Sequence, residues 1–195
     1  MKKEMIDSAI REYLSDLEAQ IKNLSLQKVH KVLDILHQAY KKGRNIYVIG
    51  NGGSATTAMH FSCDLGKGTI KNYNDKKEKR FRVFPLTGNI ATMTAIANDI
   101  GYDEVFSQQL LNLMAKGDVL IAISASGNSK NILNAVKVAK EAGVIAIGLT
   151  GFDGGKLKDV ANHSIVVKSN KYGVVEDLHL ILNHIIHYCF RKIKD

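Results

Sequence analysis

Short apolar runs alternate with segments of helical periodicity along most of this chain. Five runs have the length and β-branched content of buried strands, and they cover residues 46–49, 82–87, 118–124, 144–150 and 164–168. Helical spacing of apolar residues marks the segments between and after them, at 55–65, 90–114 with an interruption at 98–101, 131–142 and 174–192. Strands that alternate with helices predict a parallel sheet covered by helices on both faces and joined by right-handed crossovers.

The only proline of the chain, Pro85, lies inside the second predicted strand. Proline has no backbone N–H, so it cannot donate to the hydrogen-bond ladder of a sheet and is tolerated mainly on edge strands or at irregularities. We therefore expect the strand at 82–87 to lie near an edge of the sheet.

Residues 4–42 precede the first strand and carry the pattern of two helices. One side of the first helix carries Ile6, Ile10, Tyr13, Leu14, Leu17 and Ile21, and a second amphipathic helix follows it. We expect one domain over residues 1–195, with a helical arm at 1–42 and an α/β core with a C-terminal helix at 43–195. The apolar stripe of the arm is wide enough to pack on another subunit, which predicts a homo-oligomer.

Two glycine- and serine-rich turns follow strands one and three. The first, Gly-Asn-Gly-Gly-Ser at residues 50–54, lets the backbone approach a ligand closely and places a hydroxyl beside free amides at a helix start. The second, Ser-Ala-Ser-Gly-Asn-Ser at residues 124–129, again leads into a helix. Clustered hydroxyls at two helix N-termini suit a phosphomonoester, which needs several donors around three oxygens.

The first turn also fits a dinucleotide-binding fingerprint, Gly50-x-Gly52-x-x-Ala55. That alternative requires an acidic residue after the second strand to hold the ribose, whereas this strand ends in Thr87-Gly88-Asn89. A P-loop would require a lysine that the turn lacks. Both observations favour a simple phosphate ester as ligand.

Composition and charge exclude several classes of protein. An apolar content of 45% over 195 residues argues against disorder. The formal charge of +8 could indicate nucleic acid or a membrane surface, but the basic residues are scattered and no nucleic-acid motif accompanies them. We therefore interpret the charge as a solvated surface and expect neither nucleic acid nor a membrane as partner.

The cysteines and the N-terminal segment bear on the compartment. Cys63 and Cys189 lie in apolar, helix-like surroundings without metal-ligand spacing, which predicts reduced core thiols. The first residues lack the apolar run of a signal peptide, and no stretch reaches the length that spans a bilayer. We expect a cytoplasmic protein.

The two turns, together with Leu149-Thr-Gly-x-Asp-Gly-Gly155, strongly resemble the SIS (sugar isomerase) domain family, and within it the phosphoheptose isomerases. The resemblance covers almost the whole chain. It implies a flavodoxin-like sheet of five parallel strands and a homotetramer with active sites between subunits. It also implies an enzyme that interconverts sedoheptulose 7-phosphate and D-glycero-D-manno-heptose 7-phosphate.

Aldose–ketose interconversion moves a proton between neighbouring carbons through an enediol, so an acid and a base must flank the substrate. His60 and Asp64 are spaced i, i+4 on the helix that leaves the first turn, and so share a face. Glu176 and His184 are eight residues apart on the last helix, within about 80° of each other at about 100° per residue.

The resemblance implies roles for these residues. Asp64 and His184 match the catalytic acid/base pair, and His60, Asp64, Glu176 and His184 match a zinc site. The chain departs from the family pattern with Asp64 in place of glutamate, Glu176 in place of glutamine and Gly173 in place of aspartate. The expected substrate- and phosphate-binding residues are Asn51, Gly52, Gly53, Ser54, Asn98, Asp99, Ser124, Ala125, Ser126, Ser129 and Glu176.

Two other functions remain open from the sequence. One is a non-catalytic SIS protein that binds a protein partner, as the bacterial replication-initiator-associating protein does, and the other is a sensor of sugar phosphates. A fold alone does not separate these from an enzyme. A paired carboxylate and histidine favours the enzyme, because a protein that only binds has no need of them.

Overall fold

The computed structural model describes residues 3–193. Its centre is a parallel sheet of five strands: β1 (Asn45–Gly50), β2 (Arg82–Pro85), β3 (Val119–Ser124), β4 (Ile145–Gly151) and β5 (His163–Val167). The strand order is β2-β1-β3-β4-β5, the flavodoxin-like order. The predicted fold class is thus confirmed, and strand bounds differ from the prediction by one or two residues.

Strand β2 is an edge strand, as its proline predicts. Pro85 lies opposite Val48 of β1 at the last paired position of the strand. The chain leaves the sheet after this pair, and the Leu86 amide donates a further hydrogen bond to the Val48 carbonyl at 3.0 Å. The missing N–H of proline therefore interrupts no interior ladder.

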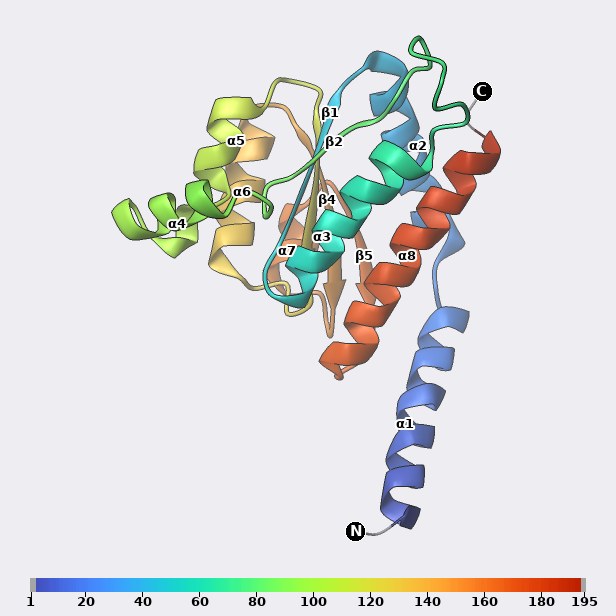
Figure 1. Cartoon of the computed structure of the whole chain (residues 1–195). Coiled ribbons are helices and arrows are strands. Elements are labelled where there is room, and N and C mark those ends of the chain that lie inside the picture. Colours follow the sequence, from blue (N-terminus) through green and yellow to red (C-terminus); the bar gives the residue numbers. More distant parts are fainter. Residues whose placement is uncertain (1–2, 194–195) are drawn as a thin grey trace.

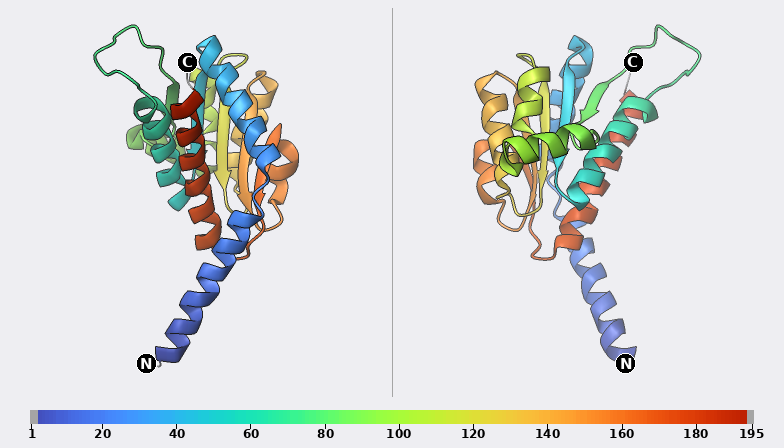
Figure 2. Two further views of the ribbon diagram at one scale, coloured as in Figure 1. Left: turned by 90° about the vertical axis from the view of Figure 1, so that its right-hand side faces the viewer. Right: turned by 60° about the vertical axis from the view of Figure 1, so that its left-hand side comes forward.

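Two layers of helices enclose the sheet (Figures 1 and 2). Helices α2 (Leu26–Lys42), α3 (Gly53–Cys63) and α8 (Tyr172–Ile193) bury their apolar faces in one core cluster. On the opposite face, α5 (Ser107–Leu113), α6 (Lys130–Glu141) and α7 (Gly155–Val160) pack in the second cluster. The predicted interruption near residue 100 separates α4 (Ile90–Asp99) from the short helix η2 (Tyr102–Glu104) and α5.

The N-terminal helix α1 (Lys3–Lys22) stands apart from these layers (Figures 1 and 2). None of its described residues is buried, and polar contacts tie its second half to the start of α8. The Tyr13 hydroxyl donates to Asp177 Oδ2 at 2.6 Å, and Ser169 Oγ donates to Asp16 Oδ2 at 2.7 Å. Of the two N-terminal helices, α1 is therefore the one that projects from the body of the protein (Figure 2).

The prediction that residues 1–42 as a whole form the arm needs correction for α2. Val32, Leu36 and Ala39 of this helix are at most 3% exposed and belong to the core. An amphipathic pattern shows that a helix has one buried face but does not show which surface covers it. Here the chain's own sheet covers α2.

The helix that leaves the first turn changes its hydrogen bonding before it ends. Helix α3 runs to Cys63, and a π-helical turn, η1 (Asp64–Gly68), continues it. π-Turns are rare and occur often at functional sites.

Cys63 is exposed and Cys189 half-buried, so the prediction of two core thiols is wrong for Cys63, whose position on α3 faces outward. No helix within residues 3–193 has the length and apolarity needed to cross a bilayer.

Candidate functional site

The two predicted turns lie side by side at the carboxyl ends of β1 and β3. The chain passes from β1 into α3 on one face and from β3 into α6 on the other, so the turns flank the topological switch point where ligands bind in open α/β sheets. Neither helix start is capped by its own side chain, whereas Ser25 caps α2 and Asn89 caps α4. The N-termini of α3 and α6 thus keep amides available for an anion.

The serines of the second turn partly face each other. Ser124 Oγ and Ser129 Oγ lie 3.3 Å apart, and Ser124 is buried. Ser126 Oγ accepts a hydrogen bond from the Asn128 amide at 3.2 Å, which holds the turn itself. Ala125, also predicted here, is 7% exposed and packs under the turn in an apolar cluster with Val175 and Leu178.

The side chain of Asn51 connects the first turn to the start of α6 by hydrogen bonds. Its side-chain amide exchanges two hydrogen bonds, each of 2.9 Å, with that of Asn131, and the Tyr102 hydroxyl donates to Asn51 Oδ1 at 3.0 Å. Sequence reasoning missed Asn131 and Tyr102. Asn131 directly follows the second turn, so its place near the site could have been predicted from the sequence. No pattern in the sequence around Tyr102 indicates that it lies there. The amide of Asn51 therefore holds the two turns at a fixed separation.

A third turn, residues 151–155, locks the second. Gly127 has φ +65°, and a Cβ placed on it would lie 2.1 Å from the Gly154 carbonyl oxygen. The Leu157 amide donates to the Gly127 carbonyl at 2.9 Å. Only glycine permits this approach of two backbones, which explains the glycine within the serine-rich turn.

Three of the predicted acid/base and metal residues form one cluster. His60 Nε2 lies 3.4 Å and His184 Nε2 3.8 Å from Asp64 Oδ2, and the two Nε2 atoms lie 3.4 Å apart. Asp64 is half-buried while both imidazoles are exposed. Among residues 3–193 these three are the only group of histidine, cysteine and acidic side chains that converges in this way.

The donor atoms of this cluster fit a tetrahedral metal ion. Zinc binds histidine nitrogen and carboxylate oxygen at about 2.0–2.1 Å, and the corners of a tetrahedron of that radius are about 3.3–3.4 Å apart. Two of the three donor separations are 3.4 Å and the third is 3.8 Å. Asn183 Nδ2 donates to Asp64 Oδ2 at 2.7 Å and so supports the carboxylate from behind.

The structure does not bring Glu176 into this cluster. Its carboxylate lies against Gly53 instead, where an added Cβ would be 2.6 Å from Glu176 Oε2. Helices α3 and α8 run side by side (Figure 1), with Glu176 beside the start of α3 and His184 beside its end. Eight residues advance a helix by about 12 Å, so a shared face of α8 does not imply a shared site. The predicted fourth metal ligand, Glu176, therefore lies outside the cluster of His60, Asp64 and His184.

The remaining predicted binding residues occupy different positions. Ser54 is buried in the first turn of α3, while Gly52 and Gly53 are exposed before it. Asn98 and Asp99 are exposed at the end of α4, and the Asn98 amide donates to Asp99 Oδ1 at 2.8 Å. Within residues 3–193 no hydrogen bond joins this pair to either turn.

A second histidine of α8 lies in the interior rather than in the site. His179 is 1% exposed, and its Nε2 lies 3.1 Å from the Thr150 carbonyl oxygen. Burial lowers the pKa of His179 to about 4, and the Thr150 contact opposes this only in part. His179 is therefore neutral near pH 7 and donates Nε2–H to the carbonyl, which is a structural role.

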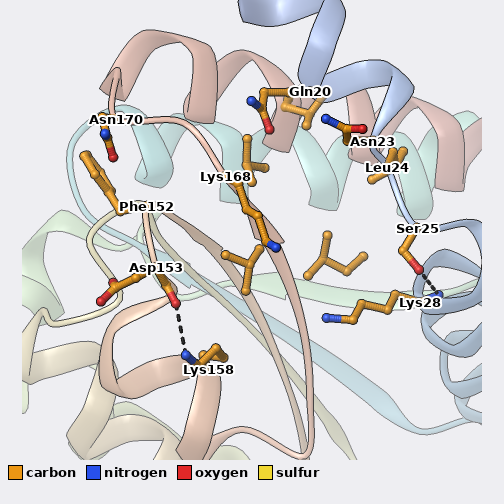
Figure 3. A pocket seen from close by; sticks show the side chains of 14 residues that line it. Gln20, Asn23, Leu24, Ser25, Lys28, Phe152, Asp153, Lys158, Lys168 and Asn170 are labelled. Carbon is orange, nitrogen blue, oxygen red and sulfur yellow. Dashed lines mark hydrogen bonds between the residues drawn. The ribbon is translucent and has the colours of Figure 1, made fainter.

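A cavity of about 1040 Å³ lies elsewhere, between the α1–α2 connection and β5 (Figure 3). Lysines 28, 158 and 168 line it together with Asp153. Two dashed contacts in Figure 3 join Ser25 to Lys28 and Asp153 to Lys158. The lining contains no histidine, no second carboxylate and no residue of the two turns, so it lacks the combination of carboxylate and imidazoles that the cluster brings together.

Comparison with known proteins agrees with this arrangement. The model of the SIS domain family matches residues 10–151. The phosphoheptose isomerase of Aliarcobacter butzleri is 39% identical over 93% of this chain and 95% of its own length. That of Helicobacter pylori strain Shi470 is 40% identical over 96% of this chain and 97% of its own.

A solved structure is similar along its whole length. The phosphoheptose isomerase of Neisseria gonorrhoeae superposes with a TM-score of 0.87 at 29% identity and covers 98% of this chain and 99% of its own. The agreement spans the projecting helix, the sheet and both turns. This chain therefore belongs to the SIS domain family and, within it, groups with the phosphoheptose isomerases.

Proposed function

We propose that this protein is a phosphoheptose isomerase that converts sedoheptulose 7-phosphate to D-glycero-D-manno-heptose 7-phosphate. The observation that carries the proposal is the cluster of Asp64, His60 and His184 at the end of α3, one helix length from two uncapped helix starts, in a chain about 40% identical to phosphoheptose isomerases. The cluster provides one carboxylate and two imidazoles, and the helix starts provide an anion site.

The spacing of these two parts suits a phosphorylated sugar. Seven residues separate Gly53 at the start of α3 from His60, which corresponds to about 10 Å along the helix axis. The phosphate would bind at Ser54 and at the second turn, through Ser124, Ser126 and Ser129 and the first amides of α6. The sugar would then extend along α3, so that its carbonyl end reaches the cluster.

Asp64 and His184 would perform the proton transfers. Isomerisation requires a base that takes the proton from C1 and returns it to C2, and an acid that protonates the C2 carbonyl oxygen and then accepts the proton of the C1 hydroxyl. Asp64 is the base in this proposal because a half-buried carboxylate held by an amide donor has a fixed position. His184 is the acid in this proposal; because its Nε2 would bind the zinc, the proton that it transfers would be the one on Nδ1.

We also propose that the site holds one zinc ion. His60, Asp64 and His184 would bind it, because their donor atoms have tetrahedral separations. Three protein ligands with one open position are typical of catalytic zinc sites. Bound zinc would polarise the carbonyl and stabilise the negative charge of the enediolate. Glu176 is not required as a ligand in this arrangement.

We propose that the protein acts as a homo-oligomer, and specifically as a homotetramer. The apolar side chains of α1 contact nothing that buries them within one chain.

The non-catalytic alternative is disfavoured, since a protein that only recognises a partner has no use for an acid/base pair beside phosphate-binding turns.

Solvent-exchange isomerisation tests the proposal. Purified protein with zinc is incubated with sedoheptulose 7-phosphate in deuterium oxide, and the aldose product is followed by NMR. We expect product that carries deuterium at C2. Asp64→Asn and His184→Gln should each lower kcat at least about 100-fold, because each removes one proton-transfer group.

Calorimetric binding of sedoheptulose 7-phosphate provides the control for these two variants. Both should bind it almost as the parent does, since the phosphate turns are intact. Turnover of both variants at the parent rate would contradict the assignment of Asp64 and His184. A parent protein that binds the sugar phosphate without turning it over would favour the non-catalytic alternative.

A further inference from the structure

Asn183 lies on the face of α8 that is turned to the core, next to the cluster of His60, Asp64 and His184. It is fully buried, while the next residue, His184, is exposed. Its neighbours along the inner face of the helix, Leu182 and Ile186, belong to the apolar core. An amide in such a place is unusual because the interior offers few partners for its two polar ends.

Only one end of this amide has a partner. Asn183 Nδ2 donates to Asp64 Oδ2 at 2.7 Å, whereas Asn183 Oδ1 is buried without any hydrogen bond. An ionised carboxylate can only accept, so the amide must turn its NH₂ group to Asp64 and its oxygen to the apolar side. A buried carbonyl left unpaired is destabilising, and such a group in a folded protein calls for an explanation.

We infer that Asn183 is a positioning residue that holds the Asp64 carboxylate in the orientation needed for metal binding and proton transfer. This inference deepens the proposed function and rests on it. The acceptor of the Asn183 bond, Asp64 Oδ2, is also the oxygen that faces His60 at 3.4 Å and His184 at 3.8 Å.

The bond acts on a carboxylate that otherwise has freedom to turn. Asp64 begins the π-turn η1 and its side chain is 15% exposed, so a rotation about its side-chain bonds would move Oδ2 away from the two histidines. An ionised carboxylate has about four acceptor sites on its two oxygens. Asn183 occupies one of them from the interior side and leaves those on the open side to the histidines, the metal and the substrate.

The test replaces Asn183 by leucine, which has the same branched shape, with two methyl groups in place of the amide, and therefore neither a donor nor an unpaired carbonyl. Zinc affinity of the metal-stripped protein is measured by competition with a chromophoric chelator, together with kcat and KM for sedoheptulose 7-phosphate and the unfolding midpoint. We expect zinc affinity and kcat to fall about 10- to 100-fold, as for other outer partners of ligating carboxylates. KM should change less than twofold, and the unfolding midpoint should stay or rise.

Asn45 offers a matched control at the opposite end of the sheet. Its Nδ2 donates to the Asp118 carboxylate at 3.3 Å, and its Oδ1 is likewise buried without a partner. Asn45→Leu should leave zinc affinity and kcat at parent values, whatever it does to the unfolding midpoint.

The outcomes separate this inference from the proposed function. Parent values of both zinc affinity and kcat in Asn183→Leu would overturn the positioning role. A parent protein that binds zinc without isomerising the sugar would defeat the proposed function, while a loss of zinc affinity in Asn183→Leu would still support the positioning role. A parent protein that does neither overturns both.

Discussion

Three residues of α8 show how one helix divides its polar side chains between structure and chemistry. His184 is exposed at the cluster, Asn183 holds the Asp64 carboxylate, and His179 is buried beneath the sheet's carboxyl end. His179 Nδ1 is buried without a hydrogen-bond partner, so protonation of that atom would leave a charge in the apolar interior. Burial therefore keeps His179 neutral and links its titration to unfolding.

We predict that protonation of His179 destabilises the fold in mild acid. The folded pKa of about 4 lies below the ordinary histidine pKa of 6.5, so the unfolded chain binds the proton more readily. The contribution of His179 is fully present above about pH 6.5 and is lost as pH falls towards 4. Its total is about 3 kcal/mol, of which about 2 kcal/mol is lost between pH 7 and pH 5.

Urea unfolding at a fixed protein concentration measures this effect at pH 7 and pH 5. His179→Gln keeps an N–H donor for the Thr150 carbonyl but cannot take up a proton, so its free energy of unfolding should fall by about 2 kcal/mol less than that of the parent between these two values. His30→Gln, at an exposed position on α2, should keep the parent's pH dependence. Equal slopes for the parent and His179→Gln would show that this residue does not titrate on unfolding.

At the scale of elements, the sequence predicts the parts that depend on local chemistry. The five strands follow from their β-branched runs, the edge position of β2 from Pro85, and the two turns from their glycines and serines. These signals are local, because chain geometry and hydrogen-bonding capacity are properties of short segments. The sequence alone was therefore sufficient for the sheet and for the two turns at its carboxyl end.

Features that depend on which surfaces meet could not be predicted. The pattern of α2 does not say that its partner is the chain's own sheet, and the π-turn at Asp64 leaves no mark in residue spacing. Helical periodicity placed Glu176 and His184 on one face but could not tell that α3 runs alongside α8 and meets them at opposite ends. Asn183 was missed because its partner Asp64 is 119 residues away.

The contact between the second and third turns gives a prediction at this scale. Gly127 and Gly43 have nearly the same backbone conformation, with φ +65° and +63°, but an added Cβ meets the Gly154 carbonyl only at Gly127 and open space at Gly43. Gly43→Ala should cost about 1 to 2 kcal/mol of stability, the strain of a left-handed alanine. Gly127→Ala carries the same strain and must also push the third turn away.

We therefore expect Gly127→Ala to weaken binding of sedoheptulose 7-phosphate at least about tenfold in calorimetry, because the displaced turn no longer holds the serines in place. Gly43→Ala should bind it as the parent does, since Gly43 caps α2 at the other end of the sheet. If both variants lose the same stability and retain the same affinity, the interlock of the two turns has no role in binding.

At the scale of the whole molecule, the apolar stripe of α1 has no partner that buries it within one chain. Ile6, Ile10, Leu14 and Ile21 are 43%, 52%, 57% and 47% exposed along one stripe of a helix that projects from the body (Figure 2). A contiguous apolar surface of this kind marks a contact with another protein. Tyr13 on the same helix donates a hydrogen bond to Asp177, so α1 is attached to the helix that carries His184.

We predict that a second copy of the chain covers this stripe. Light scattering at micromolar concentration should give about 86 kDa for the parent, four times the chain mass of 21.5 kDa. Ile10→Asp with Leu14→Asp puts two charges in the stripe and should yield a folded monomer, since no described residue of α1 is buried in the core. Ser8→Asp with Ser15→Asp adds the same charge on the opposite side and should leave the assembly intact. A parent that scatters as a monomer would contradict the prediction.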